Sequence, residues 1–115
     1  MKIRVESKID IPRALAKIDN DAFWTEAATE WWRLISPYTP MRTGALWESV
    51  SIRPKEIEYE QPYAARMYNN KFNFRKDKHP RATNKWDAAA RPAQEAKLIS
   101  ALQRYIDSGR IKLND

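Results

Sequence analysis

The stretch SPYTPMRTGALWESV, residues 36–50, separates a segment with helical periodicity from a segment with strand periodicity. Pro37 and Pro40 cannot continue a helix, and the residue before a proline avoids helical backbone angles. Gly44 allows a sharp turn, and Thr43 beside it can cap a short helical turn. We therefore predict a connection of fixed shape, which sets the angle between the elements on its two sides.

The segment before this connection has the period of an amphipathic helix. Its apolar residues recur at intervals of three and four positions, as they do on one helical face: Trp24, Ala27, Ala28, Trp31 and Ile35. The sequence therefore predicts a long, Trp-rich helix that ends at Pro37 and buries this face.

The segment after the connection alternates apolar and polar residues. Val50 and Ile52 precede the turn sequence RPKE, and Ile57 and Tyr59 follow it. This pattern predicts an antiparallel β-hairpin. Leu46 and Val50, four residues apart, are expected to pack the connection against the preceding helix.

The rest of the chain adds elements at both ends, and the expected fold is a single α+β domain over residues 1–115. The further elements are an N-terminal strand around Ile3 and Val5, a helix that begins at Asp10, a short helix in residues 61–70, an edge strand in residues 71–74 and a C-terminal helix in residues 83–109. Pro92 lies inside the last helix, where it removes a backbone hydrogen bond, so a break or a kink is expected near it.

Composition limits the classes of function that the chain can have. With no cysteine among 115 residues, disulfides and thiolate metal sites are excluded. No apolar run approaches the roughly 20 residues of a membrane span, and the first ten residues do not resemble a signal peptide. These features predict a soluble protein.

Residues that could carry catalysis are few and isolated. His79 is the only histidine, and the chain has two glycines, too few for a phosphate-binding loop. Glu95 and Lys97 match the E-x-K triplet of some nucleases, but they lie in an Ala-rich helix without the further carboxylates that a hard cation needs. We predict no enzymatic activity, no cofactor and no metal site.

The net charge of +6 is unevenly distributed. Residues 71–81 contain one acidic residue, Asp77, and the basic residues Lys71, Arg75, Lys76, Lys78 and Arg81. This segment is either a solvated basic loop or a surface that faces nucleic acid or an acidic protein. Charge alone does not separate these alternatives.

The strand after the turn carries three acidic residues, Glu56, Glu58 and Glu60, on one side. In a monomer, such a face discourages aggregation. In an assembly, it could instead face the basic segment of a neighbouring subunit, and both interpretations stay open.

Three blocks follow one another in a fixed order: P-x-x-T-G-x-L-x-x-S, then PYA, then HPRATNKW. Their residues are Pro40, Thr43, Gly44, Leu46, Ser49, Pro62, Tyr63, Ala64, His79, Pro80, Ala82 and Trp86. With these blocks, residues 20–107 resemble the small minor capsid or neck proteins of long-tailed bacteriophages, a group related to head–tail connector and tail-completion proteins. Pro92 departs from the straight last helix that the resemblance implies.

The resemblance implies a structural virion protein made in the cytoplasm of the host bacterium and placed in the phage neck. There it would form a homo-oligomeric ring around the DNA channel, between a portal-side connector and a tail-side protein, with non-specific contact to phage DNA. The alternative from another class is a small basic nucleic-acid-binding protein that acts alone. A steep salt dependence of duplex binding would identify that alternative.

Overall fold

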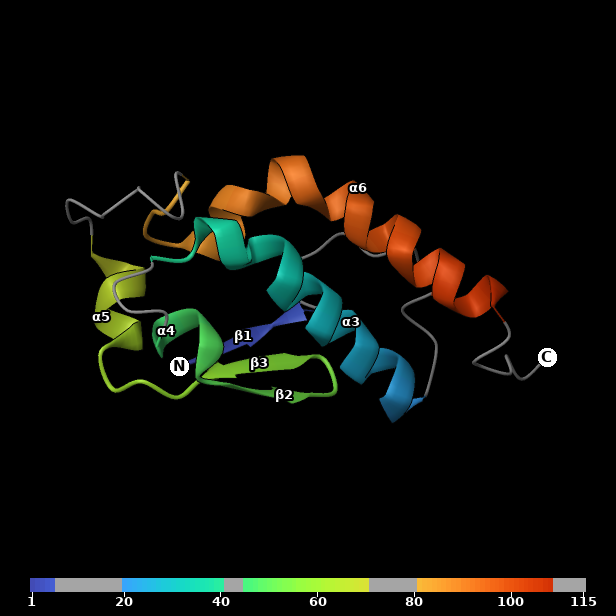
Figure 1. Cartoon of the computed structure of the whole chain (residues 1–115), viewed down its shortest axis with the longest axis horizontal. Coiled ribbons are helices and arrows are strands. Elements are labelled where there is room, and N and C mark those ends of the chain that lie inside the picture. The colour runs from blue at the N-terminus through green and yellow to red at the C-terminus, as the bar shows by residue number, and fades with distance from the viewer. Residues whose placement is uncertain (6–19, 41–44, 71–80, 109–115) are drawn as a thin grey trace.

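Helices cover one face of a three-stranded sheet in the computed structural model of the chain, and the α+β class is confirmed (Figure 1). The structure describes residues 1–5, 20–40, 45–70 and 81–108. In chain order, the elements are β1 (Lys2–Arg4), α3 (Asp21–Ile35), the 3-10 helix η1 (Ser36–Tyr38), α4 (Ala45–Glu48), β2 (Val50–Arg53), β3 (Glu56–Tyr59), α5 (Ala64–Asn69) and α6 (Trp86–Asp107). The helix predicted from Asp10 and the strand predicted in residues 71–74 lie outside the described residues.

Helix α3 is the central layer. It begins after Asn20, whose side-chain oxygen accepts a hydrogen bond from the Phe23 backbone N–H at 3.0 Å. Its predicted apolar face is confirmed, because every member of it is buried: Trp24, Ala27, Ala28, Trp31 and Ile35. Phe23 extends this buried face. The helix ends before Pro37, where η1 takes over.

The sheet has the strand order β1-β3-β2 with antiparallel neighbours, so the predicted hairpin and N-terminal strand are both confirmed. Ile57 in the middle strand pairs with Ile3 on one side and Ile52 on the other. This register places the apolar side chains together against α3, because alternate residues of a strand point to the same face.

The hairpin turn consists of two residues, Pro54 and Lys55. Lys55 has a φ of 64°, a left-handed backbone conformation that is uncommon outside glycine. Contacts on both sides hold it there: its N–H donates to the Trp24 carbonyl at 3.2 Å, and its carbonyl accepts from the Val5 N–H at 2.8 Å. Its ammonium group also lies 4.6 Å from the centre of the Trp24 ring. The turn is therefore fastened to α3.

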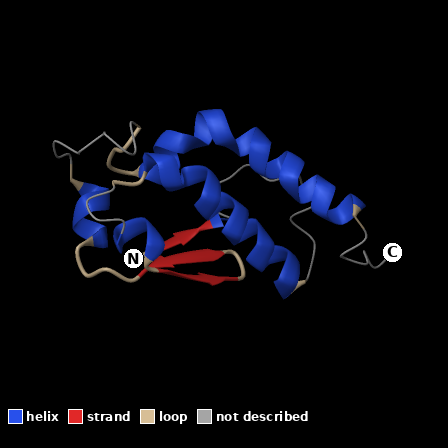
Figure 2. Cartoon of the chain, viewed as in Figure 1, coloured by secondary structure: helices blue, strands red, loops and turns tan. Residues whose placement is uncertain are grey.

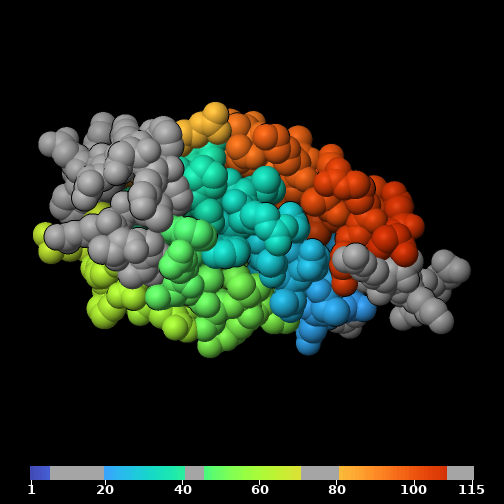
Figure 3. Space-filling model, viewed as in Figure 1, coloured from blue at the N-terminus to red at the C-terminus, as the bar shows by residue number. Residues whose placement is uncertain are grey.

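Helix α6 packs on the side of α3 that faces away from the sheet, and the two helices run antiparallel (Figure 2). Phe23 near the start of α3 contacts Tyr105 near the end of α6, with ring centres 6.3 Å apart. In Figure 3 the surface of α3 separates α6 from the hairpin. No helix in the described part of the chain has the length and apolar character that a membrane span requires.

Pro92 does not break α6. The helix is continuous from Trp86 to Asp107 with Pro92 inside it, so the predicted break is wrong, whereas the predicted kink stays a prediction. Ala90, Gln94 and Leu98 on either side are buried, and Pro92 itself is exposed. Packing of this face against α3 and η1 offsets the hydrogen bond that the proline removes.

Candidate functional site

Four separate segments of the sequence meet at the C-terminal end of α3 (Figure 1). They are residues 36–40, 45–49, 59–68 and 81–87. We call this region the motif junction, because the described parts of all three sequence blocks lie in it. Polar and aromatic side chains, described one by one below, hold the segments together.

Tyr38 of η1 ties the connection to α6. Its hydroxyl accepts hydrogen bonds from Gln94 Nε2 at 3.3 Å and from Arg81 Nη1 at 3.4 Å. Its carbonyl accepts from the Thr83 N–H at 3.0 Å. Because Tyr38 and Gln94 are 8% and 6% exposed, this link is inside the protein and not on its surface.

Trp86, the first residue of α6, fills the centre of the junction and is fully buried. Its indole N–H donates to the Tyr59 hydroxyl at 3.2 Å. Its ring lies edge-on to those of Tyr59 and Tyr68, at 5.4 and 5.1 Å between ring centres. Such perpendicular aromatic pairs are favourable beyond the area that they bury.

Asp87 is a buried carboxylate at the second position of α6. It is 2% exposed, and its Oδ1 accepts a hydrogen bond from the Tyr68 hydroxyl at 2.5 Å. Its Oδ2 has no hydrogen-bond partner among the described residues. The free N–H groups at the start of α6 favour a negative charge there. Burial, and then the hydrogen bond to Asp87, raise the pKa of Tyr68.

Burial raises the pKa of Tyr59 from 10 to about 12, and this shift predicts alkaline destabilisation. The folded protein keeps the phenol proton between those pH values and the unfolded chain loses it, so stability falls as pH rises through this window. Each proton that the folded state retains and the unfolded state loses changes the free energy of unfolding by about 1.4 kcal/mol per pH unit. The free energy of unfolding should therefore drop by roughly 2–3 kcal/mol between pH 10 and 12 on this account.

Urea titrations at a series of alkaline pH values measure this effect. In the Tyr59→Phe variant, the unfolding free energy should fall less steeply with pH than in the wild type, because one titrating proton no longer contributes to the slope. Tyr63→Phe, at an exposed position, should retain the wild-type slope. Equal slopes for the wild type and Tyr59→Phe would contradict the attribution of the alkaline destabilisation to Tyr59.

The predicted motif residues separate into a buried and an exposed group. Pro40, Leu46, Ala64 and Trp86 are buried, whereas Pro62 and Tyr63 are exposed. Ser49 links two blocks: its carbonyl accepts from the Glu60 N–H at 2.9 Å, and its hydroxyl accepts from Gln61 Nε2 at 3.2 Å. Ala82 is buried as well. Thr43, Gly44, His79 and Pro80 lie outside the described residues.

Helix α4 is fixed to α3 by an aromatic contact that the sequence did not indicate. Trp47 stacks on Trp32 with ring centres 5.9 Å apart. The Trp32 indole N–H donates to the Trp47 carbonyl at 2.8 Å. Together with the buried Leu46, this pair holds the segment that leads into β2.

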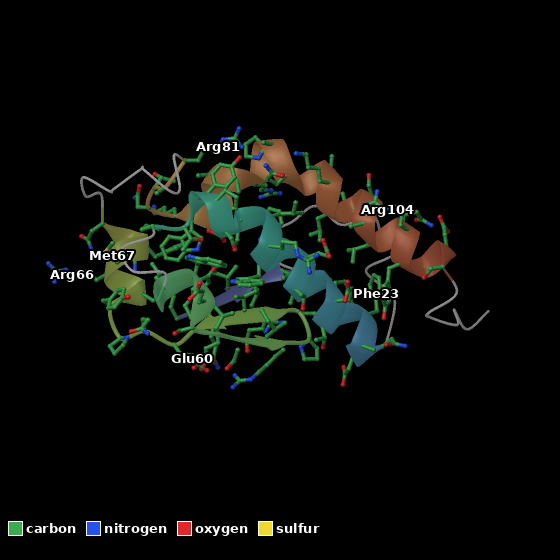
Figure 4. The ribbon with its side chains drawn as sticks, viewed as in Figure 1. Phe23, Glu60, Arg66, Met67, Arg81 and Arg104 are labelled. Carbon is green, nitrogen blue, oxygen red and sulfur yellow. The ribbon has the colours of Figure 1, made fainter. Side chains whose placement is uncertain are left out.

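The whole net charge of the chain comes from one stretch. Residues 61–86 contain seven of the 21 Lys and Arg residues and one of the 15 acidic residues, a net charge of +6. The other 89 residues have equal numbers of basic and acidic side chains. Arg66, Arg81 and Lys85 are the described basic residues of this stretch and all are exposed; we call them the basic pole. Figure 4 shows Arg66 pointing away from α5 at one end of the molecule.

Sequence reasoning found only part of the basic pole. Arg81 was among the predicted residues, and Lys71, Arg75, Lys76 and Lys78 lie outside the described residues. Arg66 and Lys85 were missed because the charge was counted over residues 71–81 alone. A count over the longer stretch would have included them.

The acidic side of the sheet is paired within the subunit. Glu58 lies 2.9 Å from Arg53 and 3.7 Å from Lys2, and Glu56 lies 3.7 Å from Arg53. Glu60 accepts a hydrogen bond from the Ser51 hydroxyl. These contacts favour a solvated face. They argue against an interface with the basic segment of a neighbouring subunit.

The residues considered for catalysis do not form a site in the described ranges. Glu95 of the E-x-K triplet pairs with Arg91 at 2.9 Å, one helical turn away, while Lys97 is exposed. Among residues 1–5, 20–40, 45–70 and 81–108, no group of three or more His, Asp or Glu side chains could hold a metal ion. His79 lies outside these residues.

A family model described as "Minor capsid protein" matches residues 16–106. This range contains α3, both hairpin strands, the motif junction, the basic pole and nearly all of α6. No curated protein and no solved structure is similar enough to the chain to count as a match.

Proposed function

The chain belongs to the minor capsid protein family, and from this premise we propose that it is a subunit of the ring that joins the head of a long-tailed phage to its tail. The family makes it a structural protein of the phage virion and points to a role without catalysis. The proposed place is the neck, around the channel through which DNA leaves the head. Residues 1–115 would act there as one domain.

The motif junction is the observation that carries the proposal. A ring of identical subunits closes only if each subunit presents its two interfaces at the correct rotation. In this chain, Tyr38 joins the end of α3 to α6, and Trp86 joins α6 to the end of β3, through buried hydrogen bonds. Ser49 after α4 accepts a backbone hydrogen bond from Glu60 after β3. The angle between the helices and the sheet is thereby fixed, as a closed ring requires.

The proposed partners follow from this position. Each subunit would contact two further copies of itself, a portal-side connector and a tail-side protein. Contact with the passing DNA would be non-specific. Assembly would take place in the cytoplasm of the host bacterium, before the finished virion is released.

A phage that lacks this protein tests the proposal. We expect its lysates to contain DNA-filled heads and free tails but few joined particles, because the connecting ring is absent. Adding the purified protein should restore joining and infectivity, as measured by electron microscopy and plaque counts. Normally joined particles in the mutant lysate would exclude the neck role.

A second candidate function, a nucleic-acid-binding protein that acts alone, is supported by the concentration of charge in residues 61–86. Sub-micromolar duplex binding by the isolated protein at physiological salt, with a steep salt slope, would favour it. Weak binding under those conditions would favour the neck subunit, which needs only slight attraction to DNA.

A further inference from the structure

We propose that α5 is a latch, which Tyr68 holds closed on the start of α6 and which opens while α3, the rest of α6 and the sheet stay folded. The closed state is the one in the structure. In the open state, α5 leaves Trp86 and Asp87, and the backbone at Lys85 relaxes. This inference goes beyond the proposed function, and it does not depend on where the protein lies in the virion.

Tyr68 holds the latch closed through contacts with three consecutive residues. Its carbonyl accepts from the Lys85 N–H at 3.0 Å, and its hydroxyl donates to Asp87 Oδ1 at 2.5 Å. Its ring lies edge-on to that of Trp86, with 5.1 Å between ring centres. One residue of α5 thus joins the helix that follows the second sequence block to the third block.

Lys85 has a strained backbone in the closed state. Its φ of 46° and ψ of 50° are left-handed, a conformation that brings Cβ too close to a carbonyl oxygen in any residue but glycine. Its N–H is bound by Tyr68, and its carbonyl accepts from the Ala89 N–H at 2.9 Å. The second bond does not require left-handed angles, because it is the ordinary bond of an α-helix. When Tyr68 leaves, Lys85 can therefore relax and the strain is released.

Asp87 provides a second driving force for opening. Its side chain is 2% exposed, and Oδ2 has no hydrogen-bond partner among the described residues. A buried oxygen without a partner is unfavourable, and the cost disappears when water reaches it. Because Tyr68 contacts this carboxyl group, the departure of α5 admits water there. The same movement thus relieves the strain at Lys85 and the unpaired oxygen of Asp87.

The packing that opening disrupts is small. Within α5, Ala64 is buried, Met67 and Tyr68 are half-buried, and the other three residues are exposed. Helix α3, in contrast, buries six residues. α5 also lies at one end of the molecule (Figure 1). Opening uncovers Trp86, which keeps the closed state the major one, but it requires less free energy than unfolding of the whole domain.

Amide hydrogen exchange, followed by NMR at several low urea concentrations, tests the latch. Met67 and Lys85 report on opening, because their N–H groups donate to carbonyls of residues 63 and 68. Ala28, inside α3, reports on global unfolding. After correction for intrinsic rates, Met67 and Lys85 should exchange about tenfold faster than Ala28 or more, with a shallower urea dependence, since a local opening exposes little surface. Equal urea slopes for the three amides would overturn the proposal.

Replacing Lys85 by glycine should tighten the latch. Glycine adopts left-handed angles without a steric cost, so Met67 should exchange roughly three- to tenfold more slowly than in the wild type. Because Met67 belongs to another element, the substitution affects it through the latch. The matched control is Lys55→Gly, at the other non-glycine residue with a positive φ in the described ranges, and it should leave Met67 exchange unchanged. An unchanged rate in Lys85→Gly, or equal slowing in Lys55→Gly, would contradict the latch.

Removing the Tyr68 hydroxyl should loosen the latch. Tyr68→Phe retains the ring beside Trp86 but takes the donor from Asp87, so Met67 should exchange about tenfold faster. Tyr63→Phe, at an exposed position next to α5, should retain the wild-type rate. Wild-type exchange of Met67 in Tyr68→Phe would show that this contact does not hold α5, and the latch would be excluded.

Discussion

Replacing Trp86 by alanine is expected to lower the free energy of unfolding by about 3–5 kcal/mol. The indole is fully buried between Tyr59 and Tyr68, and the surrounding segments are too tightly linked to collapse into the space it leaves. The Tyr59 hydroxyl also loses its indole donor. Since a domain of this size is stable by about 5–15 kcal/mol, a large part of its stability depends on this side chain.

Urea denaturation followed by circular dichroism measures this loss. Trp86→Phe retains part of the packing and loses the N–H donor, so it should give an intermediate value. Tyr63→Ala, at the exposed end of the same region, should change the free energy of unfolding by no more than about 0.5 kcal/mol. A loss below about 1 kcal/mol for Trp86→Ala would show that the motif junction does not stabilise the fold.

Replacing Pro92 by alanine is expected to raise the free energy of unfolding by about 2 kcal/mol. A proline inside a helix is about 3 kcal/mol less favourable than alanine, and the more flexible unfolded chain of the alanine variant reduces the gain by up to about 1 kcal/mol. Because Pro92 is exposed, its removal opens no cavity. The same urea titration measures the gain.

The reverse substitution one turn further along provides the control. Ala96 is exposed on the same helix, and Ala96→Pro should cost about 3 kcal/mol or more. If Pro92→Ala instead destabilised the protein, the proline would be required for the path of α6, and the buried contacts of Ala90 and Gln94 would depend on a kink there.

The elements of the fold could be predicted from the sequence where a single period continued over several residues. The buried face of α3 was found because its apolar residues recur at helical spacing over twelve positions, from Trp24 to Ile35. The hairpin was found because the alternation of apolar and polar residues stops at Pro54 and resumes at Ile57. Of the break or kink expected near Pro92, the break does not occur, because the local rule does not include the packing of the residues around the proline; the kink stays a prediction.

The motif junction could not be predicted in this way. Tyr38 and Gln94 are 56 residues apart, Tyr59 and Trp86 are 27 apart, and each pair shares a buried hydrogen bond. A periodic pattern in the sequence does not indicate which distant polar groups form hydrogen bonds with each other. The resemblance to minor capsid proteins located the blocks without revealing how they contact each other.

The acidic face of β3 shows that the register of the strands determines which charged residues pair with each other. Read along the strand, Glu56 and Glu58 are like charges on one side. Across the sheet, Glu58 stands opposite Lys2 and Glu56 stands opposite Arg53. The sequence contained all four residues, but their pairing depends on the alignment of three strands.

Among the described residues, those of 61–86 include three basic and no acidic side chains, and this excess of positive charge gives the subunit an electric dipole moment. α5 lies at one end of the long axis, and the C-terminal part of α6 lies at the other (Figure 1). In the field of a negatively charged particle, such a subunit experiences a torque that turns the α5 end forward before any surfaces touch. Encounters then begin with the correct end in front, and assembly depends less on random rotational search.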